Sequence, residues 1–354
     1  MNKLNYKKLA ILLALGLTLY LVMVFMLLHY EQGQEGATID SLKNAFWYSF
    51  VTLTTVGYGD VVPITDAGRF IGSIFLMMSF GIYAILIGQI SSIMNTFREN
   101  KKMGLDGTRF TNHVVIIGWT DFGKAVADQL VAANRKVAIV TNVKDNIDLI
   151  REYYNDKEAY VLFSDYNNID LLEKLNVNEA SVVFVNLLDD TEKLVYILNL
   201  KKKYPDAKFV VTLDNADLKT TFQTAGVTYA VSKHEISSKL LASYIFEPDV
   251  AMFSEEIISY AKTDEHFDIK QFKVLENNPY KDQYYGKIFY DLKKECNCIL
   301  IGIVKDQNGK RELLKNPEDS IKVEEDDYLI MIMNRKAVKK LTKLFNTEEG
   351  FINM

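Results

Sequence analysis

The chain has 354 residues, a net charge of −5 and a pI of about 5.6. At roughly 100–200 residues per domain, this length predicts two or three domains. Hydrophobic residues make up 49% and charged residues 25%, which excludes a fully disordered chain and a pure membrane bundle. The acidic balance argues against a nucleic-acid-binding protein. Two cysteines are too few for a disulfide scaffold and suit a reducing cytoplasm.

Two long uncharged stretches predict transmembrane helices. Residues 9–28 form a stretch of 20 residues, about the length that crosses a ~30 Å hydrocarbon core. Residues 70–97 form a second stretch of 28 residues, about 42 Å long as a helix, so it must tilt or extend beyond the membrane. The shorter apolar region and cleavage site of a signal peptide are not evident. Two stretches of full length also argue against buried core helices.

The charged flanks of these stretches predict their orientation. Three lysines precede the first stretch, and Arg98, Lys101 and Lys102 follow the second, whereas the connection between them is mostly acidic. The positive-inside rule therefore predicts that both termini lie in the cytoplasm and that the connection lies outside. We expect a multi-pass protein of the cell (inner) membrane, in contact with lipid.

The connection between the two stretches begins with an acidic, glycine-containing loop, expected at residues 31–40. Ser41 is the expected N-cap of a helix of about ten residues that ends near Thr54. This helix is too short to span a bilayer, which predicts a re-entrant segment. Residues 55–59 would then form non-helical backbone at membrane depth, which is tolerated where it is buried in protein or lines a cavity.

Residues 54–60, Thr-Thr-Val-Gly-Tyr-Gly-Asp, resemble the filter signature of potassium channels. The resemblance implies that backbone carbonyls and the Thr55 hydroxyl coordinate K⁺ as the permeant ion. One chain supplies one filter strand, so a homotetramer is implied. The implied filter residues are Thr55, Val56, Gly57, Tyr58 and Gly59, with Asp60 at the outer mouth. Trp47 and Tyr48 are expected to brace Tyr58, and the alternative is that they anchor the chain at the membrane interface.

The second stretch is the expected pore-lining inner helix, residues 68–97. Gly81 is its expected hinge, because a missing side chain weakens a helix. Related channels often have a second glycine two residues earlier, where this chain has Ser79. Ala84 and Gly88 are small residues expected to line the inner pore. The sequence has no further spans with arginine at every third position, so a voltage sensor is not expected and another device must open the pore.

From residue 113 onward, apolar runs alternate with helical segments. Strands are predicted at residues 113–117, 136–140, 159–163, 181–185, 208–212 and 228–231, and helices at 121–133, 145–155, 168–174, 190–203, 215–225 and 234–246. Short buried strands that alternate with helices predict a parallel, doubly wound, Rossmann-like sheet.

The first strand–helix turn contains an incomplete dinucleotide motif. That motif needs three glycines and an acidic residue after the second strand. Here Thr120 stands between Gly118 and Gly123, and the second strand ends without a carboxylate. NAD binding is therefore not expected, weaker binding of another adenine nucleotide is left open, and a scaffold kept for its shape is favoured. The four histidines are scattered, so the chain is not expected to be an enzyme.

Behind a two-helix pore, this domain resembles the RCK (regulator of K⁺ conductance) family, also called TrkA-N-like. Residues 118–120 fit the Gly-Trp-Thr turn of prokaryotic members, and residues 240–258 fit the crossover helix and turn. Residues 266–345, with an expected closing helix at 335–345, resemble the TrkA-C-like lobe. The expected fold class is an α-helical membrane pore followed by an α/β Rossmann-like domain and a small α+β lobe. The expected divisions are a pore (1–97), a linker (98–112), an RCK N-lobe (113–250), a connector with the C-lobe (251–345) and a tail (346–354).

The linker is short, polar and glycine-bearing, so we expect it to transmit movement of the ring as tension. Met103-Gly104-Leu105 also resembles the internal start of related channels, which implies four additional RCK subunits per channel. An ordinary linker methionine is the equal alternative.

The gating ligand is predicted from the calcium-gated relatives, in which three carboxylates near the ends of the fourth and fifth strands bind the ion. The resemblance puts these positions at Asn186, Thr212 and Asp214, of which Asp214 alone is charged. Calcium or another divalent cation is therefore expected to bind weakly there. Asp189 and Asp190 lie nearby and could substitute, or could simply cap a helix.

Together these features predict a ligand-gated, K⁺-selective channel whose tetrameric pore is controlled by a cytoplasmic RCK ring. The alternative is a TrkA-like regulatory or nucleotide-binding membrane protein, whose RCK domain senses a nucleotide rather than a divalent cation. A membrane-anchored oxidoreductase is disfavoured by the incomplete glycine motif. A sodium-selective or non-selective channel would be expected to differ at Val56, Gly57 or Tyr58.

Overall fold

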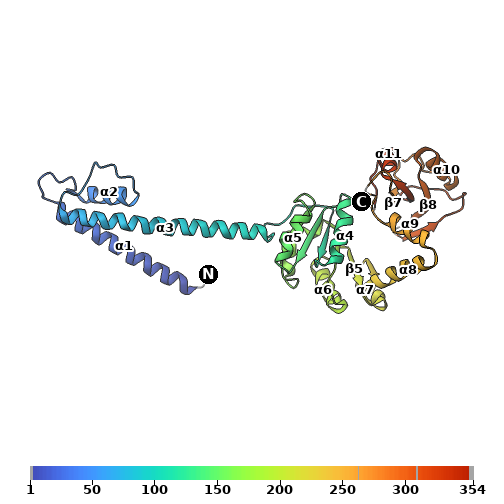
Figure 1. Ribbon diagram of the computed structural model, residues 1–354, viewed down its shortest axis with the longest axis horizontal. Helices are drawn as coiled ribbons and strands as arrows, with labels where there is room; N and C mark the ends of the chain where they lie inside the picture. Colours follow the sequence, from blue (N-terminus) through green and yellow to red (C-terminus); the bar gives the residue numbers. More distant parts are fainter. Residues whose placement is uncertain (1–2, 262, 308–309, 351–354) are drawn as a thin grey trace. The chain divides into compact units, whose positions relative to one another are not determined.

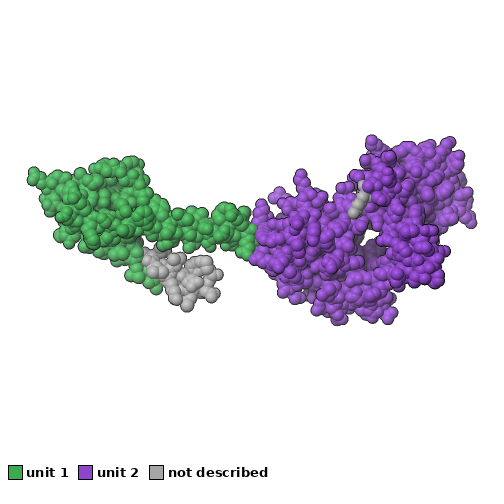
Figure 2. Space-filling view, in the orientation of Figure 1, with its two compact units in different colours: residues 1–99 green, residues 100–354 purple. Residues whose placement is uncertain are grey.

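The computed structural model describes residues 3–261, 263–307 and 310–350. The chain divides into two compact units, Met1–Glu99 and Asn100–Met354 (Figure 2). The boundary falls three residues before the end of the second long helix, Lys102. The last turn of that helix therefore belongs to the second unit.

The described part of the first unit is helical (Figure 1). Its helices are α1 (Lys3–Glu31), α2 (Leu42–Leu53) and α3 (Asp66–Lys102). Both α1 and α3 are long and apolar enough to cross a membrane, as the two uncharged stretches predict. With 37 residues, α3 is about 55 Å long, well beyond a ~30 Å hydrocarbon core.

The N-terminus of α2 is set by Ser41, as predicted. Its backbone is extended, and its side chain accepts a hydrogen bond from the Asn44 amide at 3.4 Å. This bond satisfies one of the amides that a helix start leaves without a partner. The helix ends at Leu53 with Thr54 as its C-cap, which confirms the predicted length.

The first part of the second unit is a six-stranded parallel sheet in the order β3-β2-β1-β4-β5-β6. The strands are β1 (His113–Ile117), β2 (Val137–Thr141), β3 (Ala159–Phe163), β4 (Ala180–Val185), β5 (Phe209–Leu213) and β6 (Tyr229–Ser232). The helices are α4 (Asp121–Ala132), α5 (Asp145–Tyr153), α6 (Asp190–Lys203), α7 (Lys219–Thr224) and α8 (Lys233–Phe246). The strand order reverses between β1 and β4, as in a doubly wound Rossmann sheet, which confirms the predicted fold class.

Residues of β1 alternate between the two faces of the sheet. Val115 and Ile117 lie in one buried cluster with α6 and α7 residues, and Val114 and Ile116 lie in another with α4 and α5 residues. Burial on both faces explains why the strands are continuous apolar runs.

The last part of the second unit is a smaller α+β lobe. After α9 (Pro248–Ile258), four strands form an antiparallel sheet in the order β7-β10-β8-β9. Its elements are β7 (Phe267–Lys273), α10 (Tyr285–Cys296), β8 (Ile299–Gln307), β9 (Lys310–Lys315), β10 (Tyr328–Asn334) and α11 (Arg335–Phe345). The closing helix has the predicted bounds.

Several local expectations differ from the structure. The segment expected as a helix at 168–174 is a 3₁₀-helix, Ile169–Leu175. The first five linker residues, 98–102, continue α3. The tail is bound as far as residue 350, because the Gly350 amide donates to the Gln271 carbonyl at 2.9 Å. Its last residues, 351–354, lie outside the described part of the chain.

Candidate functional site

The stretch 55–59 leaves α2 as irregular backbone with left-handed φ at every second residue. The φ angles are +61° at Thr55, +60° at Gly57 and +76° at Gly59. This alternation can turn successive carbonyl oxygens to one side, as a carbonyl-lined filter requires. The glycines adopt it at little cost, whereas β-branched Thr55 is strained there. The residue types predicted the two glycine conformations, and nothing in the sequence indicated the one at Thr55.

Two hydrogen bonds and a side chain of α3 hold the start of this stretch. The amides of Val56 and Gly57 both point to the Val51 carbonyl, at 3.0 and 3.4 Å. From α3, the Tyr83 hydroxyl donates to the Thr54 carbonyl at 2.9 Å. Tyr83 was missed by sequence reasoning because the contact joins residues 29 positions apart.

Trp47 lies against the stretch, whereas Tyr48 does not. The rings of Trp47 and Tyr58 are stacked, 6.0 Å apart and 4° from parallel. The indole Nε1 of Trp47 also donates to Asp60 Oδ2 at 2.9 Å. Tyr48 instead packs with the buried cluster of the first unit, and its hydroxyl lies against Gly72 of α3. Within the chain, Trp47 therefore makes the expected contact and Tyr48 fills the space between α2 and α3.

Glu31 does not lie in the acidic loop that was expected at residues 31–40. It is the last residue of α1 and is fully buried. Its carboxylate accepts hydrogen bonds from the amides of Ile64 and Thr65, at 2.9 and 3.0 Å, and from the Thr65 hydroxyl at 2.6 Å. These three donors compensate for the burial of the carboxylate. Glu31 thus joins the end of α1 to the segment that enters α3.

The expected hinge and pore-lining residues lie along α3. A side chain added at Gly81 or Gly88 would meet no atom within 4 Å, so packing within the chain requires neither glycine. Ala84 lies between them and is exposed in the isolated chain. Ser79 is buried, and its hydroxyl donates to the Leu76 carbonyl at 2.7 Å.

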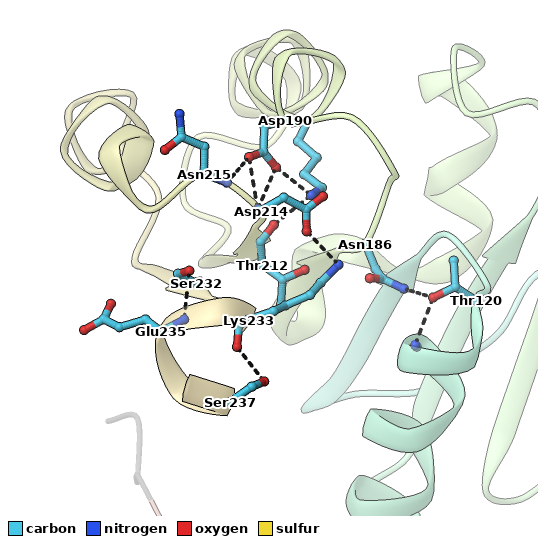
Figure 3. Close-up of polar contacts among 12 residues, drawn as sticks. Thr120, Asn186, Asp190, Thr212, Asp214, Asn215, Ser232, Lys233, Glu235 and Ser237 are labelled. Carbon is cyan, nitrogen blue, oxygen red and sulfur yellow. Dashed lines mark hydrogen bonds and ion pairs between the residues drawn. The ribbon is translucent and has the colours of Figure 1, made fainter. Parts of the chain in front are cut away.

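The carboxylates at the ends of β4 and β5 are occupied by protein donors. Asp189 caps α6 by accepting from the amides of Thr191 and Glu192, at 2.8 and 2.9 Å. Asp190 accepts from the amides of Asp214 and Asn215, as Figure 3 shows. These are the roles of helix cap and loop anchor rather than of free metal ligands.

The buried Lys193 contacts both Asp190 and the end of β5. The fully buried Lys193 ammonium lies 2.8 Å from Asp190 Oδ1 and donates to the Thr212 carbonyl at 2.9 Å. Partial burial disfavours the charged form of Asp190, but hydrogen bonds from the Asn215 amide and Lys193 outweigh it and lower the pKa of Asp190. Asp214 pairs with Lys233 at 3.3 Å. Among the described residues, no three His, Cys, Asp or Glu side chains gather in a group that could hold a metal ion.

Asn186 is directed at the first strand–helix turn instead of a cation site (Figure 3). Its side-chain amide donates to the Thr120 hydroxyl at 2.8 Å and lies 3.3 Å from the Gly118 carbonyl. Thr120 in turn caps α4 by accepting from the Gly123 amide at 3.2 Å. Gly118 has a φ of +98°, and a Cβ there would lie 2.5 Å from the Asn186 carbonyl oxygen. The Asn186 side chain and the Thr120 hydroxyl therefore occupy the polar groups of this turn.

A crevice of about 390 Å³ lies beside this turn, at the carboxyl ends of β2, β3 and β4. Its lining includes Asn142, Asp165, Tyr166, Leu187 and Thr191. Open α/β sheets bind ligands at this edge. Its lining is polar and aromatic and includes two carboxylates, Asp165 and Glu192, and no carboxylate follows β2 directly.

Comparisons with known proteins agree with this division of the chain. Residues 9–96 match the ion channel family, and residues 114–233 match the TrkA-N domain. The chain is 24% identical over 327 residues to the calcium-gated potassium channel TvoK of Thermoplasma volcanium, covering 88% of each chain. It is 23% identical over 343 residues to the probable potassium channel protein 2 of Methanocaldococcus jannaschii, covering 96% of each.

A solved structure titled GsuK channel bound to NAD matches with a TM-score of 0.39 and 16% identity. The match covers 97% of this chain and 60% of that one. The chain thus spans about 60% of the length of this solved structure.

Proposed function

We propose that this chain, which joins an ion-channel domain to a TrkA-N domain, is the subunit of a K⁺-selective channel gated by a ligand of its cytoplasmic RCK ring. The observation that carries this proposal is the left-handed φ at residues 55, 57 and 59, directly after the capped helix α2 and between two apolar helices. Backbone carbonyls in such a stretch replace the hydration shell of K⁺. Conduction is passive, and no covalent step is involved.

The proposed assembly is a homotetramer in the cell (inner) membrane, with both termini in the cytoplasm. Large apolar side chains cover the described surface of α3, among them Phe80, Ile85, Ile87 and Ile93. Their exposure in the single chain supports burial against lipid or neighbouring subunits. Thr55 to Gly59 of each subunit would form one quarter of the filter, with Asp60 at its outer mouth and Gly81 as the hinge of the inner helix.

Two ligand classes are proposed for the ring. A divalent cation is supported by the name of the relative TvoK, and an adenine nucleotide is supported by the crevice beside Asn142 and Tyr166. We place the nucleotide first in this chain, because Lys193 and backbone amides already occupy Asp190 and leave it less available to a cation. Calcium at this edge would have Asp214 as its remaining charged ligand, and Asp214 is shared with Lys233. We therefore expect calcium to act weakly, at millimolar levels.

Reconstitution in planar bilayers tests the pore. We expect a reversal potential that follows the K⁺ gradient in the presence of Na⁺. A reversal potential that ignores the K⁺ gradient would refute the proposed selectivity.

Ligand titration of channel activity tests the ring. Calcium, ADP and NAD are added separately to the cytoplasmic face of the full-length channel and of a variant that lacks residues 104–354. The truncated pore should conduct without a ligand response. If it keeps the full response, the ring is not the gate. Micromolar calcium activation that is lost in Asp214→Asn would show that Asp214 forms a strong calcium site after all.

The proposal of additional ring subunits has its own test. Met103→Ile should remove a shorter product of about 250 residues that starts at Met103. A single band from the unaltered gene would exclude this internal start.

A further inference from the structure

Two hydrogen bonds and a left-handed glycine end α3, where the segment that leads to β1 begins. The Leu105 amide donates to the Asn100 carbonyl at 3.0 Å, and the Gly104 amide donates to the Lys101 carbonyl at 3.2 Å. Together with φ of +74° at Gly104, these two bonds form a Schellman motif. A Cβ at Gly104 would collide with the Val161 carbonyl oxygen of β3. Gly104 is therefore required both for the turn and for close packing on the sheet.

Residues 103–112 are hydrogen-bonded to β3 and to the two 3₁₀-helices that follow it, Ile169–Leu175 and Val177–Glu179. The Met103 carbonyl accepts from the Phe163 amide at 2.9 Å, the Thr108 amide donates to the Lys174 carbonyl at 2.7 Å, and the Asn112 amide donates to the Glu179 carbonyl at 2.8 Å. Side chains contribute as well, since Leu105 packs against one buried cluster of the sheet and Met103 against the other.

Two side chains of the Rossmann-like domain reach this connector. The Tyr160 hydroxyl of β3 lies 2.9 Å from the Gly104 carbonyl and 2.8 Å from Asp106 Oδ1. Burial, and then the Asp106 carboxylate, raise the pKa of Tyr160, so the hydroxyl remains a neutral donor. Both of its acceptors belong to residues 104–106, which are thereby tied to β3.

On α5, Arg151 binds the end of α3 itself. Its Nη2 donates to the carbonyls of Lys101 and Lys102 at 3.1 and 3.0 Å. The last carbonyls of a helix lack partners within the helix, and a cation there also interacts favourably with the helix dipole. The Lys102 ammonium completes the contact with Asp148 of α5 at 2.7 Å.

We propose that residues 100–112 are a rigid connector, and that Arg151 and Tyr160 are positioning residues that couple the RCK ring to the inner helix. A slack linker of ten residues could extend to about 33 Å and would absorb a displacement by straightening. A connector hydrogen-bonded to β3 and α5 moves with them and carries their displacement into the last turn of α3. This inference rests on the proposed function, and it replaces tension in the linker, the expected mode of transmission, with movement of a bound segment.

Hydrogen–deuterium exchange on the full-length protein in detergent tests the connector without any ligand. The amides of Leu105, Thr108 and Asn112 should exchange at least about tenfold more slowly than unprotected amides, because each is hydrogen-bonded in folded structure. Exchange of all three at the unprotected rate would overturn the proposal.

Variants test the coupling. Arg151→Gln and Tyr160→Phe should each reduce the response of open probability to saturating calcium or ADP by about fivefold, the factor that corresponds to about 1 kcal/mol of one such bond. Binding affinity for the probe and K⁺ selectivity should stay unchanged. Lys157→Gln, at an exposed site in the same domain, is the matched control and should respond like the unaltered channel.

The outcomes separate the two proposals. If the unaltered channel responds and both variants respond equally well, the coupling role is wrong. If the unaltered channel responds to no probe, ligand gating fails as a proposed function, and the exchange experiment alone decides whether the connector is rigid.

Discussion

Replacing Glu31 by glutamine should loosen the segment that links the filter to the inner helix. The side chain is fully buried and accepts three hydrogen bonds, at 2.9, 3.0 and 2.6 Å. Glutamine preserves the shape but keeps one acceptor oxygen, and its amide nitrogen would face an N–H or O–H donor. Hydrogen bonds to a charged group contribute about 1.5–3 kcal/mol each, so we expect a loss of about 2–4 kcal/mol.

The assay is thermal unfolding of the full-length protein in detergent, combined with K⁺ flux into vesicles. The melting temperature of the first unit should fall by on the order of 10 °C, because 1 kcal/mol shifts Tm by about 4–8 °C in a domain of this size. The K⁺ flux should fall too, since Ile64 and Thr65 lie between Asp60 and the start of α3. Glu35→Gln is the matched control, because Glu35 is exposed in the neighbouring loop.

Melting of Glu31→Gln within about 2 °C of the unaltered protein would refute the predicted role of Glu31, because the expected fall in Tm is on the order of 10 °C. Unchanged melting would mean that water or another group replaces the lost acceptor. Unchanged flux with a lowered Tm would confine the role of Glu31 to stability.

Three further predictions concern the filter, the ring edge and the response to pH. Gly57→Ala should abolish K⁺ selectivity in reversal-potential measurements, since a Cβ at φ of +60° costs about 1–2 kcal/mol per chain. The control Gly33→Ala, at φ of +87° outside the filter, should leave K⁺ selectivity unchanged. Lys193→Met should lower the stability of the second unit by about 3 kcal/mol in thermal melts, because Asp190 loses its buried cation, and Asp190→Asn in the same chain should recover part of this loss. Burial lowers the pKa of His113 in the folded state, so the unfolded state binds the proton first and stability should decline as pH falls below about 6.5. His113→Gln should remove this decline, and an identical pH profile for variant and unaltered protein would contradict the assignment.

Local patterns predicted most of the secondary structure. The strands at 113–117 and 159–163 and the helices at 190–203 and 335–345 have the predicted bounds. Their apolar runs and capping residues lie within the segments themselves, so a short window of sequence contains the relevant information. The segment expected as a helix at 168–174 illustrates the limit, because its i to i+3 bonding was not evident from residue types.

The candidate site was predictable where it depends on residue type and not where it depends on distant contacts. The left-handed backbone at Gly57 and Gly59 could be predicted, because a residue without a side chain adopts positive φ at little cost. The buried role of Glu31 depends on residues 33 and 34 positions away, and the role of Tyr83 on one 29 positions away. The sequence left Asp190 as either a cation ligand or a helix cap. Its ion pair with the buried Lys193, which also donates to the Thr212 carbonyl of β5, is seen only in the structure.

The sequence by itself determined the two apolar helices, the filter-like stretch and the alternation of strands and helices, because hydrophobic length, glycine and periodicity act locally along the chain. Only the tertiary structure decided which polar groups are free to bind a ligand. Asp189, Asp190 and Asn186 are occupied by amides, Lys193 and Thr120, and residues 103–112 are hydrogen-bonded to β3 and to the 3₁₀-helices that follow it. The physical reason is that a polar group can bind a ligand only if no protein group already forms its hydrogen bonds. Sheet order and helix packing bring those protein partners together from positions far apart in the chain.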